Sequence, residues 1–212
     1  MTHPLCYRFG PVQTDTNGVR ELLMSFRQWV PKGHTGKENT EGKALCIIGA
    51  RQIGKTTLIR EFGKNEYEHF AEINFVTDEK AADIFKDKLT AEAIITNLTA
   101  YLQKPLEPGK TLILFDEVQE CPAVRSAIKF LVEDGRFDYI EAGSLLGVRY
   151  KEVKSYPVGF EQILPMYPLD FEEYLWANGI QNHTLQYLKS CYDKKEKVSE
   201  TVHETLCKLF YS

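Results

Sequence analysis

The stretch ALCIIGARQIGKTTLIREF, residues 44–62, decides the fold of this chain. It opens with the apolar run 44–48, and the residues from Gly49 to Thr56 then follow the pattern G-x-x-x-x-G-K-S/T. Residues 57–62 are predicted to begin a helix. Between a strand and a helix, this pattern is typical of phosphate binding. The glycines let backbone N–H groups approach phosphate oxygens, and the helix N-terminus attracts those oxygens. The stretch therefore predicts a phosphate-binding loop.

The residue types in this loop indicate a nucleotide bound together with a metal ion. Lys55 is expected to bridge the β- and γ-phosphates, and the Thr56 hydroxyl is expected to ligate Mg²⁺. The alternative is a glycine-rich turn with a solvated lysine. The residues expected to bind the nucleotide are Gly49, Ala50, Arg51, Gln52, Ile53, Gly54, Lys55, Thr56 and Thr57.

A second motif follows the apolar strand predicted at residues 111–115. Asp116 and Glu117 end this strand, at the carboxyl edge where ligands bind in open α/β sheets. Successive strand side chains point to opposite faces, so the two acids can have separate roles. We expect Asp116 to hold the metal, directly or through water, and Glu117 to orient and deprotonate the attacking water. Taken alone, the pair is also compatible with an acidic strand end that enters a loop.

Apolar strands and amphipathic segments alternate after residue 44, which predicts an α/β fold with a parallel sheet. A further strand at residues 162–166 would lie at a sheet edge because Pro165 lacks an N–H group. Asp170 and Glu173 resemble a capping box at a helix start. The other predicted strands are residues 44–48, 71–76, 111–115 and 137–142, and the other predicted helices are residues 90–102 and 123–133.

The ends of the chain depart from this alternation. Residues 19–30 have apolar side chains at helical spacing, and residues 31–42 are rich in Gly, Lys and Thr. Residues 1–43 are therefore expected to form an N-terminal helix and a flexible loop, residues 44–179 the core, and residues 180–212 a polar helical tail.

Composition excludes several protein classes. With 212 residues, 43% hydrophobic and 26% charged, the chain is neither disordered nor collagen-like. It has no run of about 20 apolar residues that could span a bilayer, and no secretory signal at its start. Its five cysteines form no C-x-x-C pair, which favours reduced thiols in the cytoplasm over a zinc site. A net charge of −4 indicates no global attraction to nucleic acid, although a local basic patch is not excluded.

Four segments, in order, resemble the AAA-type ATPases of bacteria and archaea that usually carry a C-terminal DUF4143 region. These are GARQIGKTTLIREF, LILFDEVQECP, EAGSLLG and PVGFEQILPMYPLDFEEYLWANG, within residues 44–179. The resemblance implies a three-layer α/β sandwich with a mostly parallel central sheet, the P-loop fold of the additional-strand (AAA+) type. It also implies ATP and Mg²⁺ as ligands.

The resemblance adds a third catalytic residue to Lys55 and Glu117. Ser144 stands where the family has a polar sensor, on a strand between the two strands that carry the motifs, and its hydroxyl would bond the γ-phosphate or the attacking water. The alternative is that Ser144 only caps the following turn. Gln119 is expected either to hold the catalytic loop or to lie on the surface.

Two departures from the family concern arginines and length. Relatives often have a basic residue where this chain has Phe160, which puts in doubt an arginine acting from that position. Arg125, Arg136 and Arg149 remain as candidate arginine fingers or as solvated surface residues. Relatives are generally longer, so the tail at residues 180–212 is expected to be the start of a C-terminal region that is missing or lost.

The hypothesis from the sequence is an ATPase that hydrolyses ATP to ADP and phosphate with Mg²⁺ and couples this to an unknown partner. The alternative is a nucleotide-dependent switch with little hydrolysis, because no lid or arginine finger can be identified. A small-molecule kinase is disfavoured, since Asp116 and Glu117 suit activation of water. A protein partner or self-association is compatible with this hypothesis, and DNA enters by family analogy alone.

Overall fold

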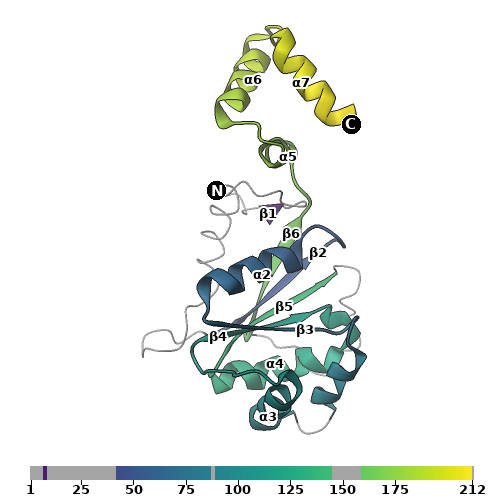
Figure 1. Ribbon diagram of the computed structural model, residues 1–212, viewed down its shortest axis with the longest axis vertical. Coiled ribbons are helices and arrows are strands. Elements are labelled where there is room, and N and C mark those ends of the chain that lie inside the picture. The colour runs from purple at the N-terminus through teal and green to yellow at the C-terminus, as the bar shows by residue number, and fades with distance from the viewer. Residues whose placement is uncertain (1–6, 9–41, 87–88, 145–158, 212) are drawn as a thin grey trace.

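The computed structural model describes residues 7–8, 42–86, 89–144 and 159–211, and these form a six-stranded sheet with short β1 at one edge and β3 at the other (Figure 1). The strand order is β1-β6-β2-β5-β4-β3, and every pairing is parallel. The strands are β1 (Tyr7–Arg8), β2 (Ala44–Gly49), β3 (His69–Asn74), β4 (Thr111–Asp116), β5 (Asp138–Ser144) and β6 (Glu161–Tyr167). The helix predicted at residues 19–30 and, apart from Gly42, the loop predicted at residues 31–42 lie outside the described residues.

Helices cover both faces of the sheet (Figure 1). Helix α2 (Lys55–Glu66) packs on one face. The other face carries η1 (Glu79–Phe85), α3 (Ala91–Leu102) and α4 (Pro122–Asp134). The predicted three-layer α/β sandwich is therefore confirmed.

Strand β4 shows why the predicted strands are continuous apolar runs and do not alternate with polar residues. Leu112 and Leu114 belong to the core under α2, whereas Ile113 and Phe115 belong to the core under α3 and α4. All six residues of the strand are buried. A parallel sheet covered on both faces needs apolar side chains at successive positions instead of an alternation. The Asp116 carboxylate is therefore held at the end of a buried strand, and Glu117 follows directly after it.

The strand predicted at residues 71–76 is shifted in the structure to residues 69–74. It ends where Asn74 pairs with Asp116. There the Asn74 side-chain oxygen accepts hydrogen bonds of 3.0 Å from the N–H groups of both Val76 and Thr77, which turns the chain away from the sheet. The sequence pattern extended the strand over the apolar residues Phe75 and Val76. In the structure the hydrogen bonds of the Asn74 side chain end the strand before them.

The edge position predicted for residues 162–166 is wrong, because β6 lies between β1 and β2. Pro165 pairs with Ile48 of β2. Strand β1 reaches only Met166 and Tyr167, so no β1 residue lies opposite Pro165. Among the described residues, the missing proline N–H therefore removes no bond to β1.

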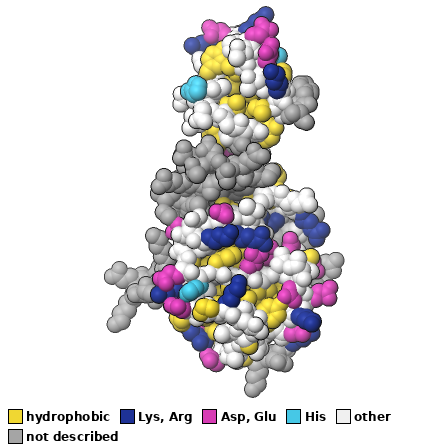
Figure 2. All heavy atoms as spheres, in the orientation of Figure 1, with side chains coloured by type: hydrophobic (Ala, Val, Ile, Leu, Met, Phe, Trp, Pro, Cys, Tyr) yellow, Lys and Arg dark blue, Asp and Glu magenta, His cyan; other side chains and the backbone are white. Residues whose placement is uncertain are grey.

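Three helices follow β6 and lie beyond the sheet (Figure 1): α5 (Phe171–Ala177), α6 (Asn182–Lys194) and α7 (Glu200–Tyr211). The predicted capping box begins α5, since the Asp170 side chain accepts from the Glu173 N–H at 2.9 Å and the Glu173 side chain accepts from the Asp170 N–H at 2.8 Å. Hydrophobic side chains lie exposed among polar ones on this part (Figure 2). Among the described helices, none has the length and apolar character needed to cross a membrane.

Candidate nucleotide-binding site

The phosphate-binding loop joins the carboxyl end of β2 to the start of α2. Gly54 has φ 91°, and Gln52 has φ 61°, so the loop turns twice through left-handed backbone. At Gly49 a Cβ atom would lie 2.4 Å from the Met166 carbonyl oxygen of β6. Glycine at this position lets the loop start against the neighbouring strand, which a side chain would push away. The predicted strand, loop and helix are therefore present in that order.

Lys55 is the first residue of α2 and is 6% exposed. Its Nζ donates hydrogen bonds to the carbonyl oxygens of Gly49 at 3.2 Å and Ala50 at 2.6 Å. Burial lowers the pKa of Lys55, and the nearby carboxylates of Glu117 and Asp116 act in the opposite direction. The lysine thus lies against the loop that the sequence assigns to phosphate, beside the helix N-terminus.

The next residue connects the loop to the acidic strand end. Thr56 Oγ1 donates a hydrogen bond of 2.9 Å to Asp116 Oδ2, although the two residues are 60 positions apart in the sequence. The other oxygen, Oδ1, accepts the Glu117 backbone N–H at 3.0 Å. Asp116 is 2% exposed, and burial raises its pKa while the Thr56 hydrogen bond lowers it. The two predicted metal ligands therefore lie in direct contact.

This pair fits a Mg²⁺ ion by the chemistry of its donors. Mg²⁺ prefers oxygen ligands, usually one or two from the protein together with phosphate oxygens and water. Thr56 and Asp116 offer a hydroxyl and a carboxylate next to the loop. The residues present thus suit the metal that the sequence predicts.

Asn74 is a site residue that the sequence analysis missed. Its Nδ2 donates to Asp116 Oδ2 at 3.0 Å, the same oxygen that accepts from Thr56. Asn74 ends β3 beside Asp116 in the sheet register. The signal that could have found it is a polar residue at the carboxyl end of a predicted strand, but the misplaced strand boundary concealed it.

Glu117 follows the strand with a left-handed backbone, φ 56° and ψ 45°. The short helix η2 (Val118–Glu120) starts directly after it. Gln119 Nε2 donates a hydrogen bond to Glu117 Oε2, so Gln119 is not an isolated surface residue. The carboxylate is half-buried at the sheet edge that carries the loop.

Ser144 ends β5, which lies between β2 and β4 as predicted. It pairs with Gly49, the first residue of the loop, and is 6% exposed. The structure thus brings Ser144 to the carboxyl-terminal end of the parallel strands, where Lys55 and Glu117 also lie. The turn that Ser144 was alternatively expected to cap, residues 145–147, lies outside the described residues.

Both predictions for Arg125 are wrong, because it is neither solvated nor available as an arginine finger. It lies on α4, is 2% exposed, and its Nη2 donates to both Glu161 carboxylate oxygens at 2.6 Å. Arg136 is also engaged, in ion pairs of 2.7 Å with Glu92 and Asp134. Arg149 lies outside the described residues.

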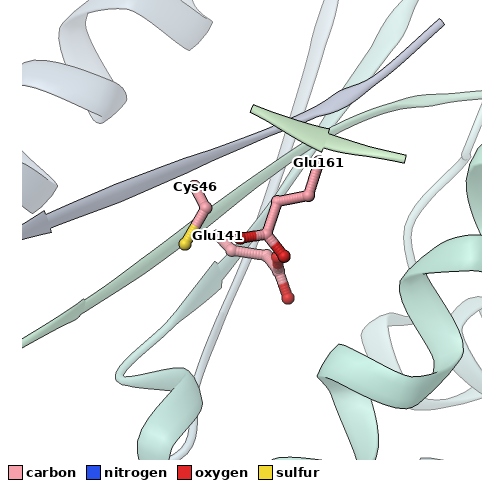
Figure 3. A group of neighbouring side chains, drawn as sticks. All are labelled: Cys46, Glu141 and Glu161. Atoms are coloured by element: carbon pink, nitrogen blue, oxygen red, sulfur yellow. The ribbon is translucent and has the colours of Figure 1, made fainter. Parts of the chain in front are cut away.

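Arg125 belongs to a buried polar cluster with Cys46, Glu141 and Glu161. The latter three come from adjacent strands and are shown in Figure 3. Ligand atoms of the latter three lie within 4.8 Å of one another. Glu141 is 0% exposed, and among the described residues neither carboxyl oxygen has a hydrogen-bond partner. Burial and then the Glu161 charge raise the pKa of Glu141 to about 8, although Arg125 opposes this.

The cluster contains one guanidinium and two carboxyl groups. If Glu141 keeps its proton, Arg125 and Glu161 balance each other and no net charge is buried. Burial likewise raises the pKa of the Cys46 thiol, which favours its neutral form. A sequence pattern could not have shown this, because the charged residues stand singly among apolar neighbours.

The AAA domain family model matches residues 41–175 of the chain. No curated protein sequence matches the chain. Among solved structures, Cdc6p from Pyrobaculum aerophilum aligns at 13% identity and TM-score 0.46, over 82% of this chain and 50% of that chain. The RuvB Holliday junction branch migration motor of Thermotoga maritima aligns at 18% identity and TM-score 0.45, over 81% of this chain and 51% of that chain.

A third similar structure is Drosophila ORC bound to GC-rich DNA and Cdc6, at 9% identity and TM-score 0.42, over 92% of this chain and 79% of that chain. The chain spans about half the length of the Cdc6p and RuvB chains. Its strand order places β5 between the strand of the phosphate loop and the strand of Asp116, as the additional-strand fold requires. Since the family model covers more than half of the sequence, the protein belongs to the AAA domain family.

Proposed function

We propose that the protein binds ATP with Mg²⁺ at residues 49–57 and hydrolyses it to ADP and phosphate. The observation that carries the proposal is the 2.9 Å hydrogen bond from Thr56 to Asp116, because it joins the phosphate loop to the acidic strand end. Only a fold that places these distant motifs at one sheet edge can present a triphosphate and its metal to the same residues.

Each site residue has a role in this reaction. Lys55 exchanges its contacts with the Gly49 and Ala50 carbonyls for contacts with phosphate oxygens. Ser144 donates its hydroxyl to the γ-phosphate or to the attacking water. Glu117 orients that water and takes its proton. Bound Mg²⁺ would supply Lewis-acid stabilisation of the charge that develops on the phosphate oxygens.

A nucleotide-dependent switch with little hydrolysis is the second candidate, and the arginines favour it. Arg125 is buried in an ion pair with Glu161, and Arg136 is held by Asp134 and Glu92. The described part of the chain therefore offers neither of these two arginines to the γ-phosphate. The finger would then come from Arg149, which lies outside the described residues, from a partner or from a second copy of the chain. In the last two cases turnover of the isolated chain would be slow.

The remaining features of the proposal have separate grounds. A cytoplasmic location follows from the cysteine pattern, a C-terminal DUF4143 region and coupling to DNA come from the family resemblance, and a protein partner or self-association is compatible with the ATPase hypothesis. On the described surface of the face in Figure 2, basic side chains are interspersed with acidic ones, so DNA binding there has no continuous basic surface to support it. We therefore put a protein partner or self-association before DNA.

The test is ATP binding and turnover by the wild type, Lys55→Ala and Glu117→Gln. We expect Lys55→Ala to weaken ATP binding at least tenfold, and Glu117→Gln to bind ATP normally with turnover about 100-fold lower. Lys64→Ala, at the exposed end of the same helix, is the matched control and should change neither. Unchanged turnover in Glu117→Gln would refute the general base, and unchanged ATP binding in Lys55→Ala would refute the loop assignment.

A further inference from the structure

We propose that Gln119 positions the Glu117 carboxylate, and that the absence of a side chain at Gly143 leaves room for the Gln119 amide. The proposal rests on the proposed hydrolysis of ATP, because it assigns to Gln119 the orientation of the group that takes the proton from water. It adds a residue that lies outside both motifs of the site and connects the base to the strand that carries Ser144.

The backbone after β4 brings Gln119 back to Glu117. Glu117 is left-handed at φ 56° and ψ 45°, and the Glu120 N–H donates to the Glu117 carbonyl oxygen at 3.0 Å. This hydrogen bond closes a tight turn over residues 117–120. The amide of Gln119 then donates from Nε2 to Glu117 Oε2. A non-glycine residue with this φ is uncommon, so the turn is maintained against a conformational cost.

The hydrogen bond leaves one carboxylate oxygen of Glu117 for catalysis. Oε2 is occupied by Gln119, whereas no residue in the described ranges bonds to Oε1. A general base needs a fixed carboxylate with one oxygen open to water. Because an ionised carboxylate only accepts hydrogen bonds, the amide must present its nitrogen to it, and this decides which way Gln119 points.

The other end of the same amide lies against β5. Gln119 Oε1 is buried and has no hydrogen-bond partner among the described residues. It lies over Gly143, where an added Cβ atom would come within 2.9 Å of it and within 3.4 Å of Val118 Cγ2. A residue with a side chain at position 143 would therefore displace the amide. Gly143 precedes Ser144, so the contact connects the candidate sensor strand to the base.

The first experiment measures ATP turnover and the affinity for a non-hydrolysable ATP analogue. In Gln119→Ala we expect kcat to fall roughly 10- to 100-fold, because the carboxylate loses its orientation, while KM and the analogue affinity stay within about twofold. Gly143→Ala should lower kcat in the same direction, and it should cause no further loss when combined with Gln119→Ala. Glu120→Ala, exposed in the same turn, is the matched control and should leave kcat unchanged.

The second experiment tests whether Gln119 acts through Glu117. In the Glu117→Gln background, Gln119→Ala should cause little further loss of kcat, because there is no base left to orient. Independently of turnover, the side-chain amide resonances of Gln119 in the nucleotide-free protein should shift on Glu117→Ala. They should stay in place on Glu120→Ala.

The outcomes separate this proposal from the proposed function. If Glu117→Gln does not lower turnover, the proposed function fails. If Glu117→Gln lowers turnover but Gln119→Ala does not, the proposed function stands and the positioning role is refuted. The positioning role is also refuted if Gln119→Ala lowers kcat equally in both backgrounds, or if it weakens analogue binding and lowers thermal stability to the same degree as kcat.

Discussion

Glu141 makes the stability of this protein depend on pH, and Glu141→Gln should abolish that dependence. In the folded state this carboxyl group is 0% exposed beside Glu161, and its pKa is raised from 4.5 to about 8. In the unfolded chain water surrounds the group, and its pKa returns to about 4.3. Between these two values the folded protein keeps a proton that the unfolded chain has released.

The sign of the effect follows from this difference. The group stabilises the fold fully below about pH 4, and this contribution is lost as the pH rises towards the folded pKa near 8. The free energy of unfolding should therefore fall by up to about 1.4 kcal/mol per pH unit, and by on the order of 5 kcal/mol in total. Arg125 and Glu161 face the group, and their ion pair is kept in Glu141→Gln. Cys46 is adjacent, and in Glu141→Gln its thiol loses one of the charges that raise its pKa, although burial still raises it.

The assay is urea denaturation of the nucleotide-free wild type and Glu141→Gln at several pH values from about 5 to 8.5. Glutamine keeps the shape of the side chain without the proton. We expect the difference in stability between the variants to move in favour of Glu141→Gln as the pH rises. Glu120→Gln, at an exposed position, should follow the wild type. If wild type and Glu141→Gln show the same pH dependence, the reasoning about a buried neutral acid is wrong.

Two further predictions concern residues that sequence analysis misjudged or missed. Arg125→Met should lower the free energy of unfolding by about 3–5 kcal/mol, because it leaves the Glu161 carboxylate buried without its cation, and Arg125→Met with Glu161→Gln should recover most of the loss. Urea denaturation checks this. A loss below about 1 kcal/mol would show that breaking the ion pair does not leave an uncompensated buried charge. Asn74→Ala removes a donor to Asp116, so it should weaken binding of an ATP analogue about tenfold with Mg²⁺ and much less without it. Calorimetric titration with and without Mg²⁺ measures this, and an equal loss in both conditions would contradict a role for Asn74 at the metal ligand.

What the sequence by itself determined is local. The order of strand, glycine-rich loop and helix over residues 44–62 predicts a phosphate loop. Glycines let the backbone N–H groups approach the phosphate oxygens, and the helix that follows points its N-terminus at the same oxygens. The apolar run before Asp116 likewise predicts a buried strand with its acids at the carboxyl end. These inferences hold because the pattern and the structure involve the same few residues.

What only the tertiary structure decided depends on residues far apart in the chain. The contact of Thr56 with Asp116, the donation from Asn74, and the burial of Arg125 with Glu161 all join different elements. No local pattern encodes which strands become neighbours, since that choice comes from packing both sheet faces at once. For the same reason the sequence indicated a solvated residue or an arginine finger at Arg125, and only the covered sheet showed that Arg125 and the Glu161 side chain are interior.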